Sequence, residues 1–167
     1  PKIARGIATW SEIVAVLREK LKPKGWSKSD KENYALVINE ENNVAIAVTT
    51  GDEKTGIASA VPSNKSPKGA NTIDVVETNK QVDMFSELIP SITNKIKGGV
   101  ATWVLLVHIA ENEVRSELSL PCDIHKGKII EWKERIILPA ISLDDDLFEQ
   151  ELTDIPDIEV PINKKKV

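Results

Sequence analysis

The chain has 167 residues, of which 41% are hydrophobic and 29% are charged, and this length and composition are typical of one globular domain. No apolar run approaches the roughly 20 residues that a membrane-spanning helix needs, so no membrane partner is expected. No apolar signal segment is visible at the start, and Cys122 is the only cysteine, which excludes an internal disulfide. A reducing, cytoplasmic location is therefore predicted.

The formal net charge is −4, but the charges are unevenly distributed. Residues 1–30 carry seven basic side chains against three acidic ones, whereas residues 144–159 carry eight acidic side chains and no basic one. Such asymmetry can mark a surface for a charged partner, and it can equally mark two regions that neutralise each other in the fold. The overall negative charge argues against a general nucleic-acid binder.

The first predicted element is a helix. Thr9 is suited to be its N-cap, and Glu12 stands three residues later to complete a capping box. Pro23 and Gly25 are expected to end the helix. The residues that form its apolar stripe are Trp10, Ile13, Val14, Leu17 and Leu21.

A β-hairpin and a long loop are predicted next. Two apolar strands at 34–39 and 44–50 are joined by a turn at 40–43, where asparagine can adopt a positive φ. Residues 51–76 then show no periodicity and are rich in turn-forming residues. A loop of this length is uncommon inside a domain and is often functional or mobile.

A second helix is predicted from about residue 79 to residue 94. Pro90 lies inside this span and can kink or split the helix. The side chains that we expect to face the core are Val82, Phe85, Leu88 and Ile89.

A second hairpin carries the strongest β signal, with a two-residue turn at 111–112. Its opposite, exposed face pairs His108 with Arg115 and also carries Glu117. A further strand follows from about residue 127 to residue 138, with a polar face of Glu131, Lys133 and Arg135. The pairs expected on the core face of the hairpin are Trp103–Leu120, Leu105–Leu118, Val107–Ser116 and Ile109–Val114.

Together these elements predict an α+β fold. We expect an antiparallel or mixed sheet of about five strands, made of two hairpins plus a further strand, with two main helices packed on one face. Residues 1–141 are predicted to form a single domain. Residues 142–167 are predicted to be an acidic, proline-punctuated C-terminal extension that docks on the domain or trails from it.

The face that carries His108 and Glu117 is the best polar grouping in the sequence. A histidine with a carboxylate neighbour can act as a general base, and Ser119 or Cys122 would then supply a nucleophile. The more ordinary interpretation is a sheet face covered by solvent or by a partner. Two histidines and one cysteine have no zinc-site spacing, so neither a metal nor a cofactor is predicted.

Glu131-Trp132-Lys133 has the spacing that metal-dependent nucleases use, in which carboxylates hold the metal and a lysine polarises the attacking water. Asp123 or Asp74 would supply the second carboxylate. Alternating charges on an exposed strand produce the same letters, and cross-strand ion pairs are their more ordinary use. A metal-dependent nuclease or phosphoesterase is therefore kept as the alternative function.

The turn from Gly51 to Gly56 lies where a phosphate loop would follow a strand, but Gly56 is followed by Ile57 and Ala58 and not by the lysine and hydroxyl residue that such a loop needs. A looser role of this turn in anion contact stays open.

The absence of a catalytic motif favours a non-catalytic binding module, which would contact a protein or nucleic acid through the 51–76 loop and the exposed sheet face. A homo-oligomer formed through that face or the C-terminal extension is also expected. The predicted binding residues are Lys54, Lys65, Lys68 and Arg115.

Overall fold

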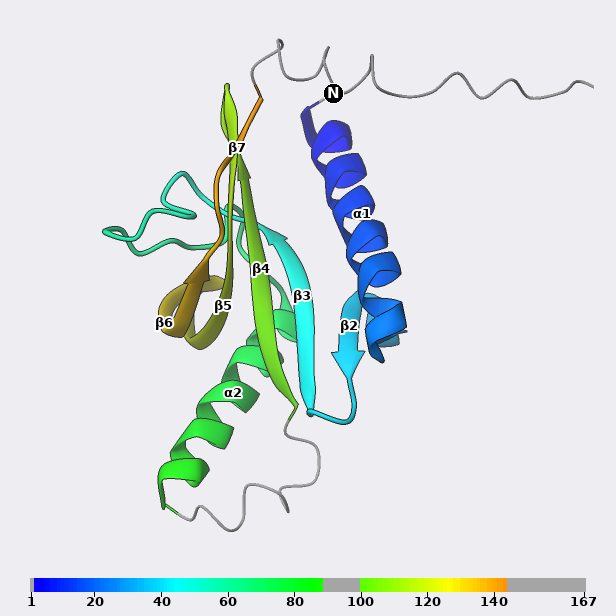
Figure 1. Ribbon diagram of the computed structural model, residues 1–167. Coiled ribbons are helices and arrows are strands. Elements are labelled where there is room, and N and C mark those ends of the chain that lie inside the picture. Colours follow the sequence, from blue (N-terminus) through cyan, green and yellow to red (C-terminus); the bar gives the residue numbers. More distant parts are fainter. Residues whose placement is uncertain (1, 89–99, 144–167) are drawn as a thin grey trace, which may run out of the picture.

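A mixed sheet with one helix on each face forms the fold (Figure 1). The computed structural model describes residues 2–88 and 100–143, with the side chains of residues 9–84 and 100–143. The described sheet has seven strands, in the order β1-β2-β3-β4-β5-β6, with β7 paired to β5. The predicted α+β class is confirmed, with more strands than the five expected.

The described helices and strands follow one another with few long connections. Two 3₁₀ turns, Lys22–Lys24 and Lys31–Asn33, flank the first strand. The remaining elements are α1 (Lys2–Leu21), β1 (Ser27–Ser29), β2 (Leu36–Asn39), β3 (Val44–Thr50), α2 (Ala70–Leu88), β4 (Ala101–Ile109), β5 (Glu113–His125), β6 (Lys128–Ile137) and β7 (Ile141–Ser142).

Helix α1 starts at Lys2, so the prediction that Thr9 is its N-cap is wrong. A capping signal does not prevent a helix from extending upstream, and Ala4 and Arg5 are good helix formers. The predicted end is correct. Gly25 adopts a φ of 83°, and its amide donates a hydrogen bond to the carbonyl of Lys22.

The first hairpin is confirmed, with Asn39 opposite Val44 and a φ of 53° at Asn43. Strand β3 then runs parallel to β4, which requires the crossover made by the loop and α2. Strand β2 begins only at Leu36, which is opposite Ala47. The last residues of β3 therefore present a strand edge that β2 does not cover.

Helix α2 begins at Ala70, so the loop covers residues 51–69 and not 51–76. Residues 89–94 of the predicted helix lie outside the described residues. The most buried positions of α2 are Thr72, Val76 and Asn79, of which two are polar. Asn79 is satisfied by backbone hydrogen bonds to β4 and β5. Because polar residues occupy buried positions of α2, apolar periodicity does not indicate where this helix begins.

The second hairpin has the predicted register from Val104–Ser119 to Ile109–Val114. Its two faces, however, are not buried as predicted. Val104 and Leu106 are 1% and 0% exposed and pack with Val76 of α2, whereas Ile109 on the predicted core face is 52% exposed. The predicted core face is therefore buried only in part, with Val107 at 9% exposure, and the opposite face is the more buried one. This hairpin is apolar on both faces, so the pattern does not show which face is covered more fully.

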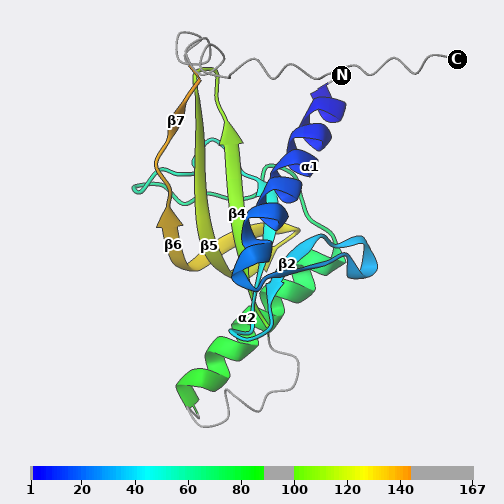
Figure 2. The same ribbon diagram turned by 45° about the vertical axis from the view of Figure 1, so that its right-hand side comes forward.

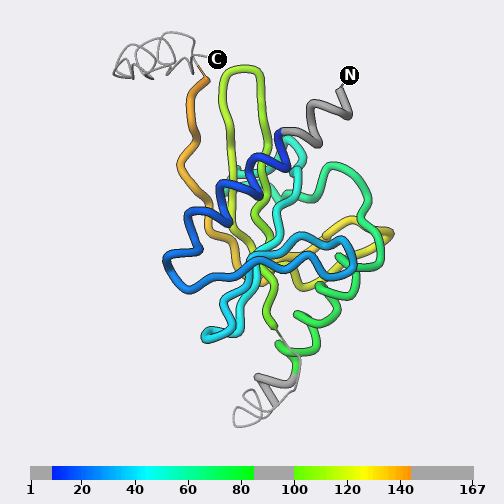
Figure 3. The backbone as a smooth tube through the Cα atoms, turned by 90° about the vertical axis from the view of Figure 1, so that its right-hand side faces the viewer, coloured from blue at the N-terminus to red at the C-terminus, as the bar shows by residue number. Residues whose placement is uncertain are grey.

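The two helices cover opposite faces of the sheet, and not one face as predicted (Figures 1 and 2). Helix α2 packs on β4 and β5 from the side of Val104 and Leu106. Helix α1 lies on the other face, where it contacts β1, β2 and β3, and Figure 3 views the molecule from this side. Neither described helix is long and apolar enough to span a membrane.

The further strand predicted from about residue 127 to residue 138 is present as β6, after a turn in which Lys126 and Gly127 both have positive φ. Strands β6 and β7 pair with successive parts of the same edge of β5. Residues 144–167, which hold nearly all of the predicted extension, lie outside the described residues.

Candidate functional site

Glu117 lies at the centre of the buried sheet face, where its side chain is 0% exposed. Its Oε2 atom accepts the Gly56 amide at 2.8 Å, and its Oε1 atom accepts the Ser119 hydroxyl at 2.8 Å. Arg135 donates to both carboxylate oxygens. Burial alone would raise the pKa of Glu117, but the hydrogen bonds from Arg135, Gly56 and Ser119 outweigh it and hold the pKa below its ordinary value.

Two arginines connect this buried face to the loop. Arg135 Nη1 donates to the Ala60 carbonyl at 2.7 Å, and Arg115 Nε donates to the Thr55 carbonyl at 3.0 Å. The face predicted to be exposed therefore lies beneath residues 51–69, and that prediction is wrong. The polar side chains of the face hold the loop, because the buried loop carbonyls need donors.

The predicted catalytic pair does not meet as proposed. His108 Nδ1 lies 3.4 Å from the Gly51 carbonyl, and no hydrogen bond joins His108 to Glu117 in the described part of the chain. The carboxylate of Glu117 is instead engaged by Arg135. The glycine-bounded turn does contact an anion through Gly56, but that anion is the protein's own glutamate.

Asn64 holds the second half of the loop and is 0% exposed. Its Nδ2 atom donates to the Gly127 carbonyl at 2.8 Å, and its Oδ1 atom accepts the Ile129 amide at 2.9 Å. Trp132 Nε1 donates to the Pro62 carbonyl at 2.8 Å. These hydrogen bonds attach the loop to β6 and to the turn before it, so the loop is packed against the sheet.

The three predicted binding lysines lie on this bonded loop. Lys54 and Lys65 are exposed, and Lys68 is half-buried where the loop enters α2. Burial, and secondarily the charge of Lys128, lowers the pKa of Lys68. The Lys68 amide donates to the Gly127 carbonyl at 2.8 Å, which fixes the backbone that carries this side chain.

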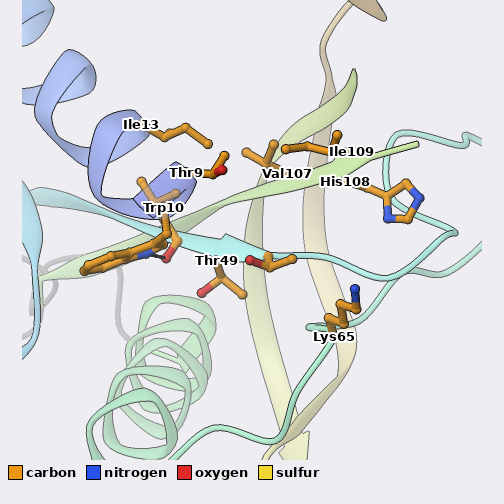
Figure 4. Close-up of a pocket in the computed structure, with 10 residues that line it drawn as sticks. Thr9, Trp10, Ile13, Thr49, Lys65, Val107, His108 and Ile109 are labelled. Atoms are coloured by element: carbon orange, nitrogen blue, oxygen red, sulfur yellow. Dashed lines mark hydrogen bonds between the residues drawn. The ribbon is translucent and has the colours of Figure 1, made fainter. Parts of the chain in front are cut away.

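Two adjoining cavities open at the free edge of β3. The first, of about 310 Å³, lies between α1 and the ends of β3 and β4, with Lys65 and His108 at one end (Figure 4). The second, of about 340 Å³, lies between β3 and the start of α2. Trp10, Val48 and Thr49 line both. We call the two cavities together the β3 cleft.

The β3 cleft exists because β2 stops short of the end of β3. Trp10 Nε1 donates to the Val48 carbonyl at 2.9 Å, and the Lys65 amide donates to the Thr50 carbonyl at 2.8 Å. Both donors use the strand edge that β2 leaves free. No aspartate or glutamate lines either cavity, although the chain contains 26 acidic residues.

The residues proposed for the nuclease alternative do not form one group. Asp123 is opposite Glu131 in the β5–β6 register, but Lys133 is paired with Asp83 of α2. Asp74 is exposed on α2. Among the described residues, no three histidine, cysteine, aspartate or glutamate side chains are grouped so as to hold a metal ion. The alternative therefore stays a prediction.

Sequence reasoning missed Arg135, Asn64 and Thr49 as parts of this region. Arg135 was placed on a polar strand face, but register shifts between Leu120 and Ile124 interrupt the regular pairing of β5 with β6. The sequence around Asn64 gives no sign that this loop asparagine is buried and not exposed. Comparisons of the chain with protein-family models, with curated proteins and with solved structures find no match.

Proposed function

We propose that this chain is a non-catalytic binding module that contacts its partner through the 51–69 loop and the β3 cleft. The observation that carries the proposal is the bonding of the loop. Buried Glu117 and Asn64 hold its backbone, while the side chains of Lys54 and Lys65 are exposed. A surface that is already ordered loses less conformational entropy when it binds than a mobile loop would.

The chemistry of the surface favours an acidic protein partner. The loop presents lysines, and the adjoining β3 cleft is lined without carboxylates. Nucleic acid would require many phosphate contacts, which a chain with a net charge of −4 is poorly suited to make. A lone cysteine and the absence of disulfides suit a cytoplasmic partner.

The proposal is tested by affinity capture from a lysate of the source cells. The variant carries Lys54→Ala, Lys65→Ala and Lys68→Ala. The matched control carries Lys20→Ala, Lys22→Ala and Lys24→Ala, which removes the same charge from exposed positions at the end of α1. We expect the wild type and the control to retain the same acidic protein and the loop variant to lose it.

Thermal unfolding of all three proteins shows whether the loop variant is folded. A folded loop variant that retains the same partner would refute the proposal. Loss of the partner in the α1 control alone would also refute it, because the contact would then lie on α1. Nuclease treatment of the lysate that abolishes capture would assign the contact to nucleic acid and contradict an acidic protein partner.

Self-association is proposed at a separate place. The uncovered part of the sheet beside α1 includes Ile109, Ile136 and Ile141, which are 52%, 43% and 63% exposed. Exposed apolar patches of this kind often mark contacts between proteins. Light scattering of the wild type and of an Ile109→Lys, Ile141→Lys variant tests this, and an unchanged monomeric mass in both would refute it.

A further inference from the structure

The start of α2 forms one wall of the second cavity of the β3 cleft. The first backbone amides of a helix have no partner within the helix, and the helix dipole places positive charge there. The first turn of α2 contains no acidic residue. A Cβ built on Gly69 would meet no atom within 4 Å, so the space beside this helix start is open.

Thr49 is a second, independent feature of the same cavity. The residue is 7% exposed and lines the cavity, and its hydroxyl has no hydrogen-bond partner among the described residues. Thr49 is opposite Leu106 in the parallel register, so its side chain lies on the α2 side of the sheet. Figure 4 shows it leaving β3 on that side. A hydroxyl that lines a cavity is able to donate a hydrogen bond to an incoming group.

Lys68 supplies the charge. Its backbone is fixed by Gly127, and its ammonium group is repelled by that of Lys128. An anion in the cavity would offset this repulsion. Tyr34, which lines the same cavity and bonds with Thr72, has its pKa raised by burial and is neutral at pH 7, so it repels no anion.

We propose that this cavity is a binding subsite for a phosphoryl group. Thr49, Lys68 and the first residues of α2 line one cavity, and a tetrahedral oxyanion accepts from more donors than a carboxylate does. The first cavity, walled by Trp10 and ending at Lys65, holds the adjoining part of the ligand. This inference rests on the proposed function and names the group by which the partner is held.

The test uses inorganic phosphate as the probe. Amide chemical shifts of the full chain are recorded during titration with phosphate, and separately with chloride at the same ionic strength. We expect saturable phosphate-specific shifts at Gly69, Ala70 and Asn71. Thr49→Val and Lys68→Gln should each weaken binding, Lys68→Gln by about tenfold, since it removes a charge-assisted hydrogen bond. Lys24→Gln, an exposed position outside both cavities and outside the loop, should leave binding unchanged.

A second titration uses a phosphoserine peptide. Tighter binding of the peptide than of phosphate assigns the group to a protein partner, and equal affinities assign it to a free phosphate compound. Shifts that appear equally with chloride, or that persist unweakened in folded Lys68→Gln and Thr49→Val proteins, would overturn the subsite. If phosphate fails to bind while the lysine-dependent capture succeeds, the subsite is wrong and the binding module stands.

Discussion

Arg135 holds the carboxylate of Glu117 with two hydrogen bonds, from Nε to Oε1 at 2.9 Å and from Nη2 to Oε2 at 2.7 Å. The same guanidinium group donates to the carbonyls of Ile57 and Ala60. One side chain of β6 thus joins a buried charge on β5 to a loop from much earlier in the chain. This pair is the point at which the binding loop is attached to the sheet.

Replacing Arg135 with leucine should strongly destabilise the protein. The change leaves the buried Glu117 carboxylate without its cation and the Ala60 carbonyl without the arginine donor, and breaking a buried ion pair in this way costs about 3–5 kcal/mol. Urea unfolding measures the free energy. Glu134→Gln, an exposed change on the same strand, should have little effect. A loss no larger than that of the control would show that the pair does not hold the fold.

The same pair predicts a loss of stability in acid. The folded pKa of Glu117 lies below its unfolded value of 4.5, so its contribution to the free energy of unfolding is complete above pH 4.5. That contribution is lost as the pH falls through the folded pKa. Between pH 7 and pH 3, the free energy of unfolding should fall less steeply in Glu117→Gln than in the wild type. Asp30, whose pKa is lowered by its hydrogen bond with Arg18, is present in both proteins and cancels from the difference. Parallel curves would contradict the assignment.

Gly56 should not tolerate alanine. Its φ is +73°, and a Cβ there would lie 2.9 Å from the Cβ of Arg115. Substitution at such a position costs about 1 kcal/mol or more, because the backbone conformation is strained and the contact must give way. Hydrogen exchange should also speed up across residues 51–69. Gly69→Ala is the matched control, since a Cβ at Gly69 meets no atom within 4 Å. Equal stability of the two variants would argue against a tightly bonded loop.

Asn64→Ala should release the second half of the loop. The change leaves the buried Ile129 amide without its acceptor, while the Gly127 carbonyl loses one donor and keeps the Lys68 amide. Each unsatisfied buried group costs about 1–3 kcal/mol. Thermal unfolding and limited proteolysis of the loop check this. Ser66→Ala, at an exposed loop position, is the control, and resistance to protease equal to that of this control would contradict the role of Asn64.

The pairing of strands could be predicted from the sequence, but the choice of the buried face could not. Alternation predicts the register of β4 with β5 because a slip by one residue moves every side chain to the other face. Leu105 and Leu106 lie on opposite faces, and both are apolar. Which of them is covered depends on where the loop and α2 pack, and those contacts are made by Asn79, Arg135 and Asn64. Polar contacts between distant segments leave no periodic signal.

The lysines of the candidate site could be predicted from the sequence, but the β3 cleft could not. Lys54, Lys65 and Lys68 are evident from the composition of the loop. The cleft depends on β2 beginning only at Leu36, opposite Ala47, and on Trp10 bonding to the free edge of β3. Trp10 follows the apolar stripe of its helix, so the spacing indicates core packing and not a cavity wall. Its partner Val48 is 38 residues away.

The most direct test of the proposed binding surface is lysine acetylation, quantified by mass spectrometry on the free chain and on the complex with its captured partner. A contact through the loop predicts that Lys54 and Lys65 lose reactivity in the complex, while Lys22 and Lys24 beyond α1 keep theirs. All four are exposed in the structure, so their reactivity in the free chain is comparable. Protection of Lys22 and Lys24 with full reactivity at Lys54 and Lys65 would contradict the assignment of the 51–69 loop as the binding surface.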